Sequence, residues 1–167
     1  MECIFCKIVN NEVPNIRIYE DSDLVAVLDI FPANPGQVLI IPKKHVERFE
    51  ELPDGIISKM FVLAKYIAIS LKALKISDYN IILSSGANAG QRVPHIALFI
   101  IPRVPNDKVV IEWERKQMDI ENLKKIGEII KNTLGSLSLS EKKKEEKKVI
   151  RKNEKKKEYK NVFKFLP

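Results

Sequence analysis

Histidine, cysteine and tryptophan are scarce in this chain: its 167 residues include two histidines, two cysteines and one tryptophan. So few cysteines exclude a small secreted domain built on disulfides, and the absence of a basic region followed by an apolar secretory core favours a reducing, cytoplasmic setting. No apolar run is long enough to cross a bilayer, which excludes a helical membrane span. Lysine, glutamate and isoleucine are abundant while glutamine is rare, a composition that favours a thermophilic source.

The few cysteines and histidines can meet in one metal site. Cys3 and Cys6 form a Cys-x-x-Cys pair that can share one Zn²⁺, and His45 and His95 can complete a closed tetrahedral site. A closed site has no open position for substrate, so its role would be structural. From spacing alone two other interpretations stay open: a reduced cysteine pair beside two unrelated histidines, and a disulfide between the cysteines, which a reducing compartment disfavours.

Four blocks of sequence occur in order between residues 2 and 103. They read ECIFCKIV at 2–9, VP with YED at 13–21, LDIFPANPGQVLIIPKKH at 28–45 and GQRVPHIALFIIPR at 90–103. Together they resemble the histidine-triad (HIT) family of nucleotide hydrolases and transferases. The family signature is Gly-Gln followed shortly by His-x-His-x-His-x-x-Pro-Arg, where x is apolar. Only the first triad histidine is present here, as His95; the second position is Ala97 and the third is Phe99.

The resemblance implies a structural zinc site without catalysis. Zinc-carrying members of the family use the positions Cys3, Cys6, His45 and His95. The family reaction attacks a nucleotide α-phosphorus with the second histidine, and Ala97 has no lone pair to act as nucleophile. Two further active-site imidazoles are replaced by Phe99 and Gln37, and a small hydroxyl residue by Arg92. We therefore expect a pseudoenzyme; a residual hydrolase that uses Gln37 or Arg92, without a covalent route, stays open.

Nucleotide binding without chemistry is a further expectation from the resemblance. Asp29 stands where the family hydrogen-bonds the ribose hydroxyls, and Ile4 and Phe5, with Ile8 and Leu28, are placed to line a base pocket. The alternative is that these apolar residues belong to the core and that the aspartate forms a turn after a strand.

Hydrophobic periodicity predicts an α+β fold, an antiparallel HIT-like sheet with a long cover helix. Alternating or apolar runs predict strands at 16–19, 24–28, 38–41, 81–84 and 96–101. Helical spacing of apolar residues predicts the cover helix over 54–77, and a second helix over 118–134 that Gly135 stops. Residues 109–113 read as one more strand. The expected organisation is a HIT-like domain over 1–110, a strand and helix extension over 111–135 and a lysine-rich tail with an apolar end over 136–167.

Positive charge is confined to the tail. Residues 1–140 hold 17 basic and 17 acidic side chains, whereas 141–167 hold 12 basic and 5 acidic ones, so the net charge of +7 comes from the tail. Clustered lysines neutralise phosphates and release counterions, which predicts salt-sensitive RNA binding. The residues expected to do this are Lys142, Lys143, Lys144, Lys147, Lys148, Arg151, Lys152, Lys155, Lys156 and Lys157. The alternative is a solvated charged segment that only aids solubility.

These patterns lead to one preferred hypothesis and two rivals. The preferred function is a catalytically inactive zinc-binding protein that joins an RNA or ribonucleoprotein, such as the ribosome, through its tail. The rivals are a nucleotide sensor or residual hydrolase, and a protein-interaction adaptor that uses the apolar end at 162–167. The resemblance also implies a homodimer through the sheet and the long helix, and no membrane partner is expected.

Overall fold

The computed structural model describes residues 3–137 of the chain. The backbone separates into two compact units, Met1–Ile111 and Glu112–Pro167. The lysine cluster predicted to bind RNA and the apolar end at 162–167 lie outside the described residues.

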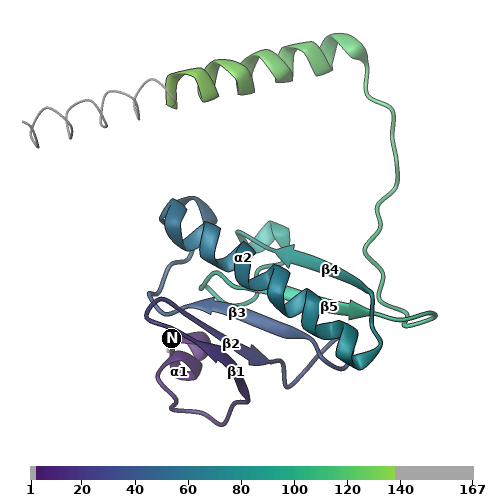
Figure 1. Cartoon of the computed structure of the whole chain (residues 1–167). Coiled ribbons are helices and arrows are strands. Elements are labelled where there is room, and N and C mark those ends of the chain that lie inside the picture. Colours follow the sequence, from purple (N-terminus) through teal and green to yellow (C-terminus); the bar gives the residue numbers. More distant parts are fainter. Residues whose placement is uncertain (1–2, 138–167) are drawn as a thin grey trace, which may run out of the picture. The chain divides into compact units, whose positions relative to one another are not determined.

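The first unit is built on one antiparallel five-stranded sheet, as predicted (Figure 1). Its strands are β1 (Arg17–Glu20), β2 (Leu24–Leu28), β3 (Val38–Pro42), β4 (Asp78–Leu83) and β5 (Leu98–Arg103), in the spatial order β1-β2-β3-β5-β4. In the β3–β5 pair, Leu39 lies opposite Phe99 and Ile40 opposite Leu98. This pairing brings the sequence block at 28–45 beside the block at 90–103, although the paired residues Leu39 and Phe99 are 60 positions apart along the chain.

The long cover helix is also present, but it is shorter than the periodicity predicts. The α-helix α2 (Asp54–Ser70) passes into a single 3-10 turn, η2 (Leu71–Leu74), and Lys75 then takes a left-handed conformation with φ of 59°. Helices commonly end at a residue in the left-handed conformation, and that residue is usually glycine. Here it is a lysine, so the sequence does not predict where the helix ends. The prediction that the helix continues to residue 77 is therefore wrong at its end.

The two faces of the sheet bury two separate clusters, because successive side chains of a strand point to opposite faces. The face under α2 carries the larger cluster, which includes Leu24, Ala26, Val38, Ile40, Met60, Ala64, Ile96, Leu98 and Ile100. The opposite face carries Phe5, Val25, Val27, Leu39, Ile41 and Ala97, and the short helix α1 (Ile4–Val9) supplies the phenylalanine. Ala97 therefore lies on the sheet face that α2 does not cover.

Three further expectations of secondary structure are corrected. β4 (Asp78–Leu83) begins three residues before the predicted start and ends one residue before the predicted end, and β5 (Leu98–Arg103) is displaced by two residues from the predicted range. Residues 109–113 form no strand, and Val110 and Trp113 are each 78% exposed. A run of β-branched and aromatic residues forms a strand only where another strand can pair with it, and this run has no such partner among the described residues.

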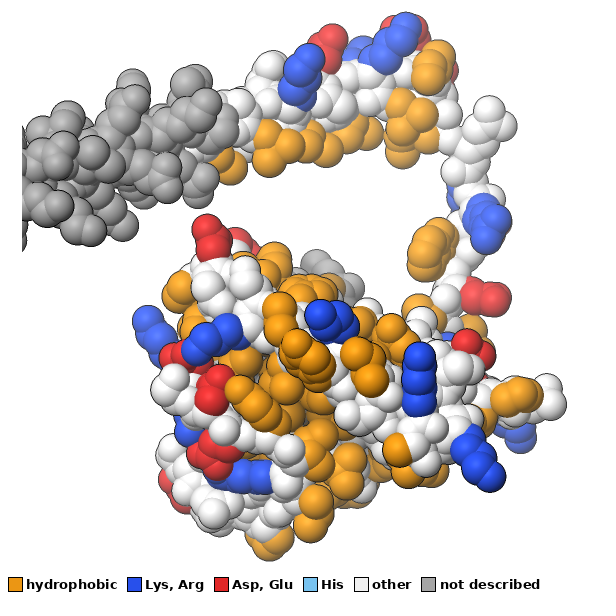
Figure 2. All heavy atoms as spheres, viewed as in Figure 1, with side chains coloured by type: hydrophobic (Ala, Val, Ile, Leu, Met, Phe, Trp, Pro, Cys, Tyr) orange, Lys and Arg blue, Asp and Glu red, His pale blue; other side chains and the backbone are white. Residues whose placement is uncertain are grey.

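The second unit contains a helix over residues 120–137, close to the predicted range. The Asp119 carboxylate caps its first turn by accepting hydrogen bonds from the backbone amides of Glu121 and Asn122, both at 3.1 Å. The helix continues through Gly135, because a glycine inside a helix costs only about 1 kcal/mol and removes no backbone hydrogen bond; the predicted stop there is wrong. Figure 2 shows apolar side chains along one side of this helix. Its exposed large apolar residues include Leu123, Ile126, Ile130 and Leu134. Within residues 3–137, no helix is both long and apolar enough to cross a bilayer.

Candidate metal centre and adjoining pocket

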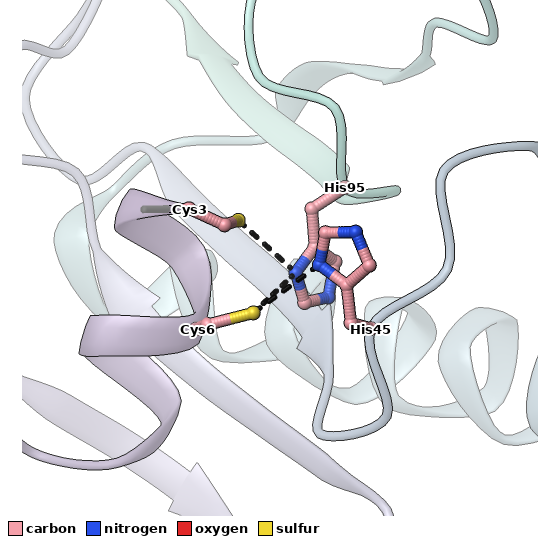
Figure 3. A group of neighbouring side chains, drawn as sticks. All are labelled: Cys3, Cys6, His45 and His95. Atoms are coloured by element: carbon pink, nitrogen blue, oxygen red, sulfur yellow. Dashed lines mark hydrogen bonds between the residues drawn. The ribbon is translucent and has the colours of Figure 1, made fainter. Parts of the chain in front are cut away.

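The four predicted metal ligands come together from three parts of the chain (Figure 3). Cys3 and Cys6 lie at the start of α1, His45 lies three residues after β3, and His95 lies three residues before β5. The amide of Ile96 donates a hydrogen bond of 2.8 Å to the carbonyl of Val46, which ties the two histidine segments to each other. The pairing of β3 with β5 thus carries two ligands to one end of the sheet, where α1 supplies the other two.

The distances among these ligand atoms fit a tetrahedral zinc ion. The Sγ of Cys3 lies 3.5 Å from the Nδ1 of His95, and the Sγ of Cys6 lies 3.2 Å from the Nδ1 of His45 and 3.6 Å from that of His95. All four ligand atoms lie within 4.8 Å of one another. Zinc bonds of about 2.3 Å to sulfur and about 2.0–2.1 Å to nitrogen, at tetrahedral angles, separate sulfur from nitrogen by about 3.6 Å. Two thiolates and two imidazoles are also a donor set that Zn²⁺ prefers.

The ring of His95 is oriented for this role by a backbone carbonyl. Its Nε2 lies 2.9 Å from the carbonyl oxygen of Pro42, and the side chain is buried. A carbonyl can only accept, so Nε2 carries the proton and the lone pair of Nδ1 faces the thiols. Burial lowers the pKa of His95 below its ordinary value, which keeps the ring neutral and able to bind a metal.

Electrostatics at the cysteines also favour a cation. Burial raises the pKa of Cys6 above its ordinary value, and the hydrogen bond and charge of the neighbouring Cys3 raise it further. Two thiolates this close repel each other, and a bound Zn²⁺ removes that cost by keeping both deprotonated.

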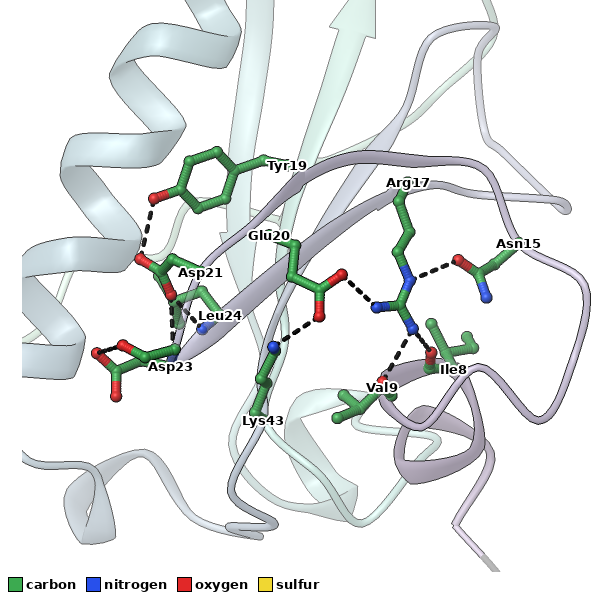
Figure 4. A network of polar contacts seen from close by, with 11 residues as sticks. Ile8, Val9, Asn15, Arg17, Tyr19, Glu20, Asp21, Asp23, Leu24 and Lys43 are labelled. Carbon is green, nitrogen blue, oxygen red and sulfur yellow. Dashed lines mark hydrogen bonds and ion pairs between the residues drawn. The ribbon is translucent and has the colours of Figure 1, made fainter.

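The carboxyl end of α1 is held independently of the cysteines (Figure 4). The guanidinium of Arg17 in β1 donates to the carbonyl oxygens of Ile8 and Val9, at 2.6 and 2.9 Å. The same group pairs with Glu20 at 2.5 Å, and Glu20 accepts a second hydrogen bond of 2.6 Å from Lys43. Arginine thus satisfies carbonyls at the end of α1, whereas the two candidate cysteine ligands lie at its beginning.

A pocket of about 660 Å³ opens beside the metal centre, on the sheet face that α2 does not cover. Its apolar part includes Phe99 of β5 and Ala97, the residue just before that strand, with Phe5 and Leu39. His95 contributes to its wall, so the pocket and the metal centre share one side chain.

The predicted nucleotide-binding residues divide between pocket and surface. Asp29 and Phe5 line the pocket, whereas Ile4 does not and is 43% exposed. Ile4 points away because it is the residue before Phe5 on a short helix, and only one of two neighbours can face the sheet. The structure therefore gives no support to Ile4 as a pocket residue.

Gln37 is committed to protein contacts inside the pocket. Its Nε2 donates a hydrogen bond of 2.6 Å to Asp29, and its Oε1 accepts one of 2.8 Å from the amide of Ala33. The side chain is only 5% exposed. Both of its polar ends thus contact the loop after β2, and each keeps capacity for one further hydrogen bond.

Sequence reasoning missed other residues that line the pocket. Phe31, Ser84 and Gln91 lie on its wall, and Arg92, which the sequence suggested only for residual hydrolysis, lies beside them. Phe31 and Gln91 fall inside the blocks that carry the family resemblance, and this position could have predicted that they line the pocket.

Comparison with known proteins identifies the family of the chain from the residues that form the sheet and the long helix. The model of the HIT domain matches residues 10–106, more than half of the chain. The chain belongs to the HIT family. An uncharacterized HIT-like protein of Methanocaldococcus jannaschii is 43% identical over 124 residues, which cover 74% of this chain and 96% of that protein. The adenosine 5'-monophosphoramidase HNT1 of Saccharomyces cerevisiae is 34% identical and covers 83% of this chain and 85% of that enzyme.

A solved structure extends the comparison to the metal. The Zn-bound histidine triad family protein of Mycobacterium smegmatis is 35% identical, with a TM-score of 0.62, over 73% of this chain and 87% of that one. The HIT fold is thus compatible with bound zinc, and the cluster of two cysteines and two histidines can hold a metal ion in this chain.

Proposed function

We propose that this protein is a catalytically inactive HIT protein whose zinc stabilises the fold and whose pocket binds a small ligand without hydrolysing it. One observation carries the proposal: Ala97, only 3% exposed, lies in the pocket at the position that the family signature gives to the nucleophile. A methyl group cannot form the nucleotidyl intermediate on which the family reaction depends.

Nothing else among the described residues of the pocket wall supplies an imidazole in its place. His95 is the only histidine there, its Nε2 donates to Pro42 and its Nδ1 faces the two thiols. Gln37 and Arg92 carry no nucleophile suited to attack on phosphorus, and Gln37 is held by its own hydrogen bonds. Hydrolysis would therefore need a different nucleophile, and the pocket wall offers no free imidazole to activate one as a general base.

Zinc in this proposal is a structural element. Cys3, Cys6, His45 and His95 would hold it, and four protein ligands leave no position for water or substrate. The ion joins α1 to the ends of β3 and β5, so its binding energy becomes folding energy. A cytoplasmic setting would keep both thiols reduced.

A hydrolysis assay tests the proposal. The zinc-loaded protein is incubated with adenosine 5'-monophosphoramidate, and released AMP is compared with a protein-free control and with the yeast monophosphoramidase run in parallel. The expected release equals the protein-free control. Release that increases in proportion to protein concentration would contradict the proposal, and Q37A and R92A variants would then identify its source.

We retain RNA or ribonucleoprotein binding as a second candidate, because of one specific feature of the sequence. The excess of seven positive charges falls within residues 141–167. Fluorescence anisotropy with purified ribosomal RNA at about 0.1 M salt tests this, since several lysine contacts still hold there. Binding that is lost in a variant ending at residue 140 would support the candidate. Equal binding by both chains, or none by either, would remove it.

A further inference from the structure

We infer that Cys3 and Cys6 are a redox-reactive pair, which a hydroperoxide oxidises to a disulfide with loss of the bound metal. This inference rests on the proposed function, because it needs the zinc that the four ligands would hold. The support lies in the distance between the two thiols, their exposure, the chemistry of the donor set and the anchoring of α1.

The two thiols are close enough to bond to each other. Cys3 is the residue before α1 and Cys6 lies in its first turn, and Figure 3 shows both sulfurs directed toward the histidines. All ligand atoms of the cluster lie within 4.8 Å of one another, so the sulfurs need to approach by less than about 3 Å to reach a disulfide bond length of about 2.05 Å. Rotation of two short side chains supplies this movement. The Cys-x-x-Cys spacing is also that of reversible pairs in disulfide oxidoreductases.

An oxidant can reach these cysteines from solvent. Both are free thiols with half-buried side chains, whereas His95 is only 1% exposed. The reactivity of a thiol toward oxidants follows its thiolate character and its exposure, and zinc ligation keeps both sulfurs deprotonated. The chain has no third cysteine, so the one disulfide that can form within a molecule joins Cys3 to Cys6.

A hydroperoxide supplies all the oxidation that the disulfide requires. One thiolate sulfur attacks a peroxide oxygen, the O–O bond breaks, and the leaving oxygen takes a proton from water, so that the sulfur becomes a sulfenic acid. The second thiolate attacks this sulfur, the S–S bond forms, and the S–O bond breaks with release of hydroxide, which is protonated to water. The two sulfurs together lose two electrons, which the peroxide oxygens accept.

A disulfide and a bound zinc ion exclude each other at this site. Zinc binds thiolates, and a disulfide sulfur carries no such charge. Oxidation would leave only His45 and His95 as protein ligands, too few for a closed tetrahedral site. The end of α1 stays attached to the sheet, because Arg17 donates hydrogen bonds to the carbonyls at residues 8 and 9. The pair therefore stays near the histidines, and reduction can restore the site.

Hydrogen peroxide added in excess to full-length protein of known zinc content tests the inference. A chromogenic chelator follows zinc release, a thiol reagent counts free cysteines, and mass spectrometry weighs the peptide that carries residues 3–6. The expected result is release of the bound zinc together with loss of both thiols, while the peptide loses the mass of two hydrogen atoms. Dithiothreitol with added zinc should restore the thiols and the zinc content.

A Cys3→Ser variant is the matched control. Its single thiol has no partner in the same chain, so in dilute solution the peptide should gain oxygen rather than lose hydrogen, whether or not this variant holds zinc. Peroxide also oxidises methionine, and Met118 is 50% exposed. Its uptake of oxygen shows that the treatment was effective. Dithiothreitol does not reverse that modification, so recovery with the dithiol assigns the response to the cysteines.

The outcomes separate this inference from the proposed function. Zinc and thiols that both remain while Met118 gains oxygen would overturn the inference and leave structural zinc in place. Cysteines that gain oxygen without forming a disulfide, and that dithiothreitol does not restore, would also overturn it. A chain that binds no zinc before treatment would instead overturn the zinc site of the proposed function, and this inference with it.

Discussion

In the proposed function zinc joins the beginning of α1 to the segments after β3 and before β5, so its removal should destabilise the protein strongly. At free zinc a thousand times its dissociation constant, binding only to the folded state contributes about 4.1 kcal/mol. For a body of about one hundred residues, each kcal/mol shifts the melting temperature by about 4–8 °C. We therefore expect a fall of about 15–30 °C on chelation. Loss of the ion should also release the beginning of α1, and with it the contact of buried Phe5 with the sheet face that α2 does not cover.

Thermal melting followed by circular dichroism checks this value. Zinc-loaded protein is compared with a sample treated with a chelator and with a Cys6→Ser variant, which lacks one ligand. The variant should melt near the chelated sample and respond little to added zinc. A shift below about 3 °C in the wild type, with one zinc ion per chain measured beforehand, would refute the structural role of the metal.

Two further predictions concern groups outside the metal centre. Arg103, above all, holds the pKa of Asp107 far below its usual range, so this carboxylate stabilises the fold above about pH 4 and the stabilisation is lost as the pH falls. In urea denaturation, the wild type should therefore lose more stability between pH 6 and pH 3 than the Asp107→Asn variant. Equal losses would contradict this prediction. Gly86 has φ of +98°, a backbone conformation that residues with a Cβ rarely adopt, so Gly86→Ala should cost roughly 1–3 kcal/mol, even though the nearby Arg48 side chain can move aside. Gly55→Ala, in a helix with open space around the glycine, should be neutral or stabilising in the same assay.

The metal centre and the sheet could be predicted from the sequence because both leave local signals. The Cys-x-x-Cys pair fixes two ligands within one turn, and His45 and His95 follow from the motif blocks. The strands β2 and β3 appear as apolar runs, since both of their faces are buried.

The errors arise where tertiary context decides. Residues 109–113 have the composition of a strand but no partner strand within residues 3–137. Lys75 ends a helix in a left-handed conformation that a lysine in the sequence does not predict. The sequence presents Gln37 as a replaced histidine or a residue for residual hydrolysis. Its hydrogen bonds to Asp29 and Ala33 cannot be predicted, because they depend on the shape of a loop.

Phosphorus-31 NMR of adenosine 5'-monophosphoramidate, incubated with protein whose zinc content has been measured, tests the central claim most directly. The account predicts a sample with close to one zinc ion per chain in which the substrate resonance persists unchanged, because Ala97 provides no nucleophile. Conversion to AMP by the zinc-loaded chain, at a rate proportional to its concentration, would contradict it.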